Sequence, residues 1–118
     1  MSPNNLLSME FVATECGFEA GVGGASNAAG TADYHYVLFG RQTDAQQPEF
    51  SGVYFEFDGQ MHGGVDRVGA ITVTDDRVSF ELRHGHRIVV RSGLSESQWA
   101  GFVKGIRDTF GDDILRKE

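Results

Sequence analysis

The chain has 118 residues, 40% hydrophobic and 23% charged, and this size and composition predict one domain spanning residues 1–118. Its formal net charge of −7 is concentrated in the first half, where residues 1–66 hold nine acidic side chains and a single basic one, Arg41. This balance argues against nucleic acid and anionic membranes as partners and favours a basic protein.

Cys16 is the only cysteine, so an internal disulfide and a cysteine-rich zinc site are both excluded. The first residues carry no basic region and no long apolar run, which predicts neither a signal peptide nor a membrane anchor. Together these features predict a cytoplasmic protein.

Two different patterns occupy the first third of the chain. Leu7, Met9, Phe11 and Ala13 alternate with mostly polar residues, which predicts a half-buried strand. Residues 17–31 are rich in glycine and other small residues without a period, and they predict a flexible loop. No Lys-Ser or Lys-Thr pair follows this tract and no helix begins there, so a phosphate-binding loop is disfavoured.

The middle of the chain predicts a central strand followed by a hairpin. Residues 34–41 are apolar on both faces, as in an interior strand. Residues 53–58 then alternate strictly, so that one face carries Val53, Phe55 and Phe57 and the other carries Tyr54, Glu56 and Asp58. Residues 59–64 supply the turn.

The second half predicts three further strands and a helix. The strands span residues 65–74, 77–83 and 87–91. Ser95 and Gln98 have the spacing of a capping box, and apolar residues recur at helical spacing up to Phe110, which predicts a helix over 95–110. The fold class is therefore α+β: a mostly antiparallel sheet of about six strands, covered on one face by the C-terminal helix.

Residues with catalytic or metal-binding chemistry form no recognisable motif. His62, His84 and His86 lack a further ligand at a diagnostic spacing, and solvated turn histidines explain them better than a metal site does. Neither a serine nor a cysteine nucleophile signature is present. No catalytic, cofactor-binding or metal-binding residue is assigned, and the protein is predicted not to be an enzyme.

The order of elements and several short motifs resemble a known family. The residues that carry the resemblance are 36–42, then Val53 to Glu56 with Gln60 and the pair Gly63-Gly64, and finally the helix that ends at Phe110. Over residues 34–110 the chain resembles the immunity protein 10 family of bacterial polymorphic toxin systems. The resemblance implies a small cytoplasmic protein that binds and neutralises a cognate toxin domain without catalysis.

The predicted partner-binding residues are Tyr54, Glu56, Asp58 and Gln60, on the acidic outer stripe of the hairpin. The toxin is expected to be basic, because an acidic inhibitor associates quickly with a basic partner. Glu56 has a second interpretation, in which it is hydrogen-bonded inside the fold and fixes the turn.

Two other interpretations remain open. The protein is either an immunity protein or, from a different class, a secretion-associated chaperone or adaptor that holds an effector. A metal-dependent enzyme built around the histidines is the third possibility. A homodimer is also compatible with the sequence.

Overall fold

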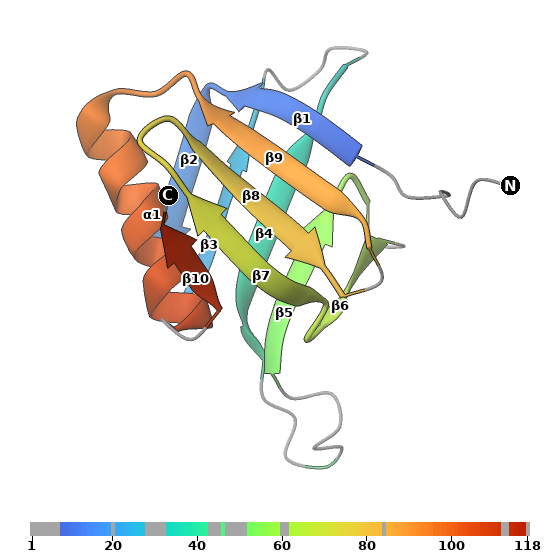
Figure 1. Ribbon diagram of the computed structural model, residues 1–118. Coiled ribbons are helices and arrows are strands. Elements are labelled where there is room, and N and C mark those ends of the chain that lie inside the picture. The colour runs from blue at the N-terminus through green and yellow to red at the C-terminus, as the bar shows by residue number, and fades with distance from the viewer. Residues whose placement is uncertain are drawn as a thin grey trace, which may run out of the picture.

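The structure is a computed structural model that describes residues 8–19, 21–27, 33–42, 46, 52–59, 62–83, 85–111 and 114–117. These residues form ten strands and one helix, arranged in two five-stranded sheets (Figure 1). The first sheet has the strand order β1 (Ser8–Ala13), β9 (Arg87–Ser92), β8 (Arg77–Leu82), β7 (Val68–Val73) and β10 (Leu115–Lys117). The second has the order β2 (Glu15–Glu19), β3 (Val22–Ser26), β4 (Tyr36–Gln42), β5 (Gly52–Phe57) and β6 (Gly63–Val65). The helix is α1 (Glu96–Phe110).

The α+β class, the mostly antiparallel pairing and the C-terminal helix are confirmed. Two five-stranded sheets are present, however, where one sheet of about six strands was expected. All pairs are antiparallel except β1 with β9 and β10 with β7. Strand β4 is central in the second sheet, as expected for residues 34–41. Its two faces are not equally covered, however, because Val37 and Phe39 are buried whereas Leu38 is only partly buried.

The core lies between the two sheets and beneath the helix. Phe55 of the second sheet contacts Phe80 of the first, with ring centroids 4.9 Å apart. Phe39 then meets Phe102 and Phe110 of α1 at 6.1 and 5.5 Å, so one aromatic cluster joins both sheets to the helix. Figure 1 shows α1 along one side of the two layers, where it closes the core.

The glycine-rich tract forms an ordered hairpin over most of its length, which corrects the predicted loop. Strands β2 and β3 pair antiparallel, with Gly21 at a φ of 82° in the turn between them. Gly23 is required because an added Cβ would lie 2.7 Å from the rings of Phe18 and Phe39. Glycine therefore marks a close approach of packed rings here. Residues 20 and 28–31 of the predicted loop lie outside the described residues.

The chain changes sheets at Asp66, which divides the predicted strand 65–74 into β6 and β7. Asp66 adopts a φ of 56°. Its N–H donates to Val53 at 2.9 Å, and its carbonyl oxygen accepts a hydrogen bond from Arg83 at 2.8 Å. Such corners let a strand leave one sheet and enter the other.

The helix begins and ends as predicted. Ser95 is the N-cap, and its hydroxyl accepts from the Gln98 N–H while the Gln98 side chain accepts from the Ser95 N–H. At the other end Gly111 has a φ of 83°, and its N–H donates to the Arg107 carbonyl at 2.9 Å. Local chemistry therefore defines both ends of α1.

Candidate partner-binding face

The outer face of the second sheet bears exposed side chains, among them Val22, which is 50% exposed. Its inner face carries Phe39, Phe55 and Phe57 into the core. The register of the strands places alternate residues on the outer face, in rows that run across the sheet. The first row holds Glu15, Ser26 and Tyr36, the second Gly17, Gly24, Leu38 and Glu56, and the third Glu19, Val22, Gly40 and Tyr54.

Glu56 lies on this face but is buried, with 7% of its surface exposed. The Tyr54 hydroxyl donates to its Oε1 at 2.5 Å, and the Tyr36 hydroxyl donates to its Oε2. Of the two interpretations of Glu56, its burial and these two hydrogen bonds support the one in which the carboxylate is hydrogen-bonded inside the fold. Its role is to hold two tyrosine side chains in place.

Asp58 is likewise engaged within the fold. Its Oδ1 accepts the Tyr36 N–H at 2.9 Å, and its Oδ2 lies 2.6 Å from His35 Nδ1. The residue has a φ of 51° at the end of β5, so its carboxylate fixes the start of the turn. Its side chain is nevertheless 22% exposed, so the binding of a partner by Asp58 stays a prediction. Gln60, the fourth predicted partner residue, lies outside the described residues.

The two tyrosines that bind Glu56 hold their protons tightly. Burial, reinforced by the hydrogen bond to Glu56, raises the pKa of Tyr36 to about 12. The hydrogen bond to Glu56 is also the main reason why the pKa of Tyr54 is raised. Both hydroxyls are therefore donors at neutral pH. Tyr36 also accepts the Gly59 N–H at 2.9 Å, so its hydroxyl joins β4 to the turn after β5.

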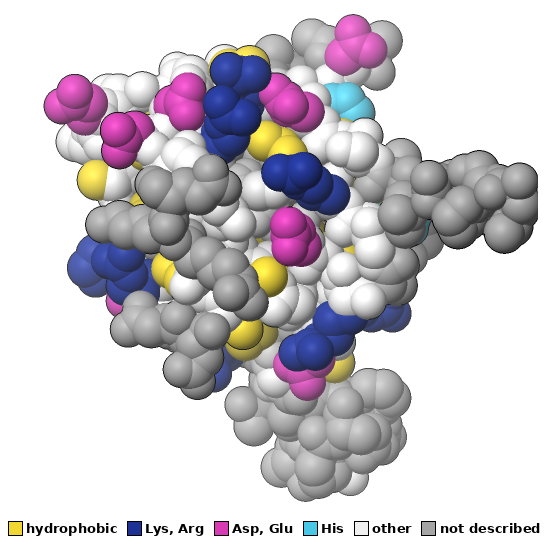
Figure 2. All heavy atoms as spheres, in the orientation of Figure 1, with side chains coloured by type: hydrophobic (Ala, Val, Ile, Leu, Met, Phe, Trp, Pro, Cys, Tyr) yellow, Lys and Arg dark blue, Asp and Glu magenta, His cyan; other side chains and the backbone are white. Residues whose placement is uncertain are grey.

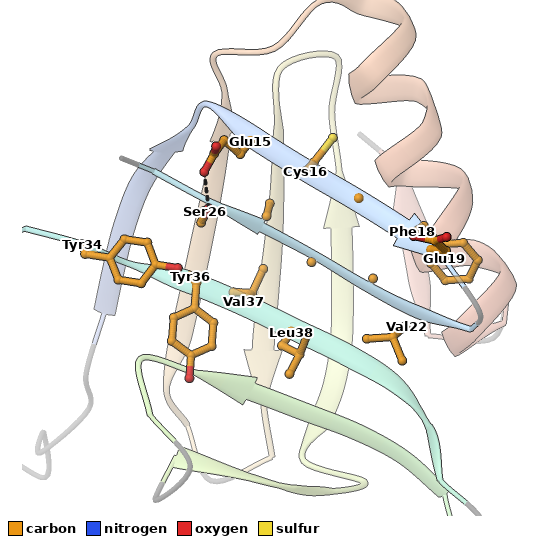
Figure 3. Close-up of a pocket in the computed structure, with 14 residues that line it drawn as sticks. Glu15, Cys16, Phe18, Glu19, Val22, Ser26, Tyr34, Tyr36, Val37 and Leu38 are labelled. Carbon is orange, nitrogen blue, oxygen red and sulfur yellow. Dashed lines mark hydrogen bonds between the residues drawn. The ribbon is translucent and has the colours of Figure 1, made fainter. Parts of the chain in front are cut away.

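A shallow groove of about 670 Å³ crosses the outer face beside these tyrosines. Gly17 and Gly24 form its floor, since neither carries a side chain. Figure 3 shows Glu15 and Glu19 toward opposite ends of β2, with Tyr34 and Tyr36 beside the Glu15 end. The only hydrogen bond drawn among the lining residues joins the Ser26 hydroxyl to Glu15, at 3.5 Å.

Apolar side chains are exposed along the same groove. Val22 is 50% exposed and Tyr34 is 39% exposed, and the two Tyr34 and Tyr36 rings lie 5.9 Å apart. A second hollow of about 230 Å³ adjoins the groove, and Val22 and Leu38 line both, with Tyr54 on its far side. The two tyrosines held by Glu56 thus line two neighbouring hollows. Val22 and Tyr34 lie toward opposite ends of the groove (Figure 3).

The groove is acidic, whereas the opposite side of the molecule is mixed in charge. No Lys or Arg occurs among the described residues that line the groove. Figure 2 shows interleaved basic and acidic side chains over the first sheet. There Arg91 pairs with Glu10 at 3.0 Å and Arg77 with Asp76 at 3.6 Å.

The other side chains considered from the sequence are engaged in packing. His62 stacks on Phe57 with ring centroids 4.7 Å apart. Burial raises the pKa of the Cys16 thiol, whereas a reactive cysteine needs a lowered pKa. In the described ranges no three His, Cys, Asp or Glu side chains are grouped so as to hold a metal ion. His84 lies outside those ranges.

Comparison of the chain with models of protein families, with curated proteins and with solved structures finds no match to any of them.

Sequence reasoning missed the groove because residues 17–31 were assigned to a loop. A signal for it exists in the sequence. Glu15, Gly17 and Glu19 alternate with Cys16 and Phe18, which is the period of a strand with an acidic outer face.

Proposed function

We propose that the protein is a cytoplasmic immunity protein that binds a cognate basic toxin domain through the outer face of the second sheet and neutralises it without catalysis. The observation that carries the proposal is the groove itself. It combines Glu15 and Glu19 with exposed Val22 and Tyr34, and no basic side chain of the described residues lines it.

Charge and rigidity both support this role. An acidic face draws a basic partner and raises the association rate, most strongly at low salt. The buried Glu56 carboxylate fixes Tyr36 and Tyr54, so the face is ordered before a partner arrives. A preorganised surface loses less entropy on binding.

The sequence resemblance to the immunity protein 10 family agrees with this proposal. No helix in the described part of the chain has the length and apolar character needed to cross a membrane.

The test is co-expression with the protein encoded immediately upstream, which is expected to be the toxin. The wild-type chain restores growth and co-purifies with the toxin. Reversing two charges, Glu15→Lys with Glu19→Lys, abolishes protection, because the face then repels a basic partner. The matched control, Asp75→Lys with Glu81→Lys, makes the same charge change on other parts of the surface and retains protection.

Two outcomes would contradict the proposal. If co-expression raises the solubility of the neighbouring protein but never rescues growth, the chain is an effector chaperone or adaptor. If both double variants protect as well as wild type, the toxin is bound elsewhere on the surface. Substitution of Glu56 is unsuitable for this test, because it removes the hydrogen bonds of two tyrosines and so perturbs the fold.

A further inference from the structure

Two acidic residues of β2 line the groove at a regular spacing. Glu15 and Glu19 stand four residues apart on one face of β2, which places their Cα atoms about 13 Å apart. Gly17 lies midway between them on the same face. An added Cβ at Gly17 would have no atom within 4 Å, so the space above it is open.

The two ends of the groove differ in their neighbours. Glu15 lies in the row that contains Tyr36, with the Tyr34 ring 5.9 Å from that of Tyr36. A cation at this end would meet a carboxylate and aromatic rings together. Glu19 lies in the row that contains Val22, whose exposed side chain offers an apolar edge beside the carboxylate.

The middle of the groove is apolar. In its central row Gly17 and Gly24 leave a flat floor, and Leu38 forms the far wall. A branched or linear aliphatic side chain would fit this floor, because it could lie on backbone and against Leu38 without displacing a side chain.

Charge decides between the possible occupants. A second copy of this chain also carries a net charge of −7, so two copies repel one another. Two of the arginines on the first sheet are already paired with Glu10 and Asp76. A partner that differs from this chain and is basic where it meets the groove is therefore favoured.

We infer that the groove binds an extended basic segment of the partner, with Lys or Arg side chains at positions i and i+4 and an aliphatic side chain at i+2. This rests on the proposed function, because the segment belongs to the toxin. In an extended chain, residues i, i+2 and i+4 share a face and repeat at the spacing of Glu15, Gly17 and Glu19. The basic side chains meet the two carboxylates, and the aliphatic one covers the glycine floor.

The test uses the whole protein and a synthetic probe, the capped peptide Lys-Ser-Leu-Ser-Lys. Binding is followed by NMR shifts of the backbone amides. We expect saturable shifts at Gly17, Gly24 and Leu38. The rearranged peptide Lys-Lys-Ser-Leu-Ser has the same charge and composition but the wrong spacing, and it binds more weakly.

Variants separate the groove from general attraction between opposite charges. The double variant Glu15→Gln with Glu19→Gln lowers the affinity for the peptide about fivefold, since two exposed ion pairs are lost. Asp75→Asn with Glu81→Gln changes the net charge equally and leaves binding unchanged. Gly17→Val removes no charge but fills the open space over the floor, and it abolishes binding.

The inference is overturned if the peptide gives no saturable shifts or if the two peptides bind with equal affinity. It is also overturned if both double variants weaken peptide binding equally. Its failure is distinguishable from that of the proposed function. If the wild-type chain and Gly17→Val protect equally well against the toxin, the proposed function stands and this inference fails. If the wild-type chain binds the peptide as expected but never restores growth, the inference about the groove stands and the proposed function fails.

Discussion

At the scale of single residues, the carboxylate of Glu56 links two tyrosines from neighbouring strands. Its two oxygens accept from Tyr36 on β4 and from Tyr54 on β5. A buried carboxylate is costly unless it is hydrogen-bonded, so these donors are needed for Glu56 to be tolerated at all. Glu56 therefore positions the two tyrosine rings that line the proposed binding face.

Removing each hydroxyl tests this arrangement. Tyr36→Phe should lower the free energy of unfolding by about 2 kcal/mol, because it loses the bond to Glu56 and the bond from the Gly59 N–H. Tyr54→Phe should cost about 1 kcal/mol, since only one bond is lost. Urea denaturation measures both, and equal losses would contradict the unequal roles of the two hydroxyls.

Alkaline pH provides an independent test of the same site. An unfolded tyrosine titrates near 10, whereas the pKa of Tyr36 is raised to about 12 in the folded chain. The folded state therefore holds this proton more tightly, and the resulting stability is fully present below pH 10 and is lost as pH rises through 12. Unfolding free energies between pH 9 and pH 12 should fall for wild type and fall less steeply for Tyr36→Phe. Identical slopes would refute this source of stability.

At the scale of elements, one of the two glycines inside the helix lies against the chain's own β2. An added Cβ at Gly105 would lie 2.7 Å from Phe18 Cδ1 and 3.1 Å from Phe18 Cβ. At Gly101, four residues earlier, nothing lies within 4 Å. The glycine side of α1 is thus partly occupied by Phe18, and this explains one of the two helix glycines.

These two glycines make a matched pair of substitutions. Gly101→Ala should stabilise the protein by about 0.5–1 kcal/mol, because alanine favours a helix interior and meets no neighbour. Gly105→Ala should destabilise it by about 1–2 kcal/mol, because the Phe18 ring must move. Thermal denaturation followed by circular dichroism compares them. Stabilisation by both would show that Phe18 moves aside without cost.

At the scale of the whole molecule, the two sheets and the helix share one core. Phe39 contacts the helix, Phe55 contacts Phe80 across the sheets, and Phe80 contacts Phe110. Because these contacts form one connected cluster, no sheet can lose its packing without disturbing the other. The chain length predicts a single domain, and we therefore expect the whole chain to unfold cooperatively.

That prediction can be tested with two probes of different regions. Trp99 is the only tryptophan and reports on the helix, whereas far-UV circular dichroism reports on all the secondary structure. Denaturant transitions measured by the two should coincide, as in two-state unfolding. Separate midpoints would show that the helix and the sheets unfold as distinct units.

Much of the fold follows from local patterns, whereas most of the candidate partner-binding face does not. The helix between Ser95 and Gly111 was predictable because caps and apolar spacing act within a few residues. The alternation that places Phe55 and Phe57 in the core was predictable for the same reason. The hairpin of β2 and β3 was not, since its glycines are individually poor strand formers.

What the sequence determined by itself is the class of the fold, the helix and its ends, the inward face of β5 and the acidity of the first half. Only the tertiary structure decided which outer residues are available to a partner. Glu56 and Asp58 have the pattern of surface carboxylates, yet Tyr36, which binds both, comes from a strand some twenty positions earlier. Likewise Gly23 is tolerated within a strand because the Phe39 ring packs over it. Alternation is a property of one strand, whereas burial depends on neighbours that only folding brings together.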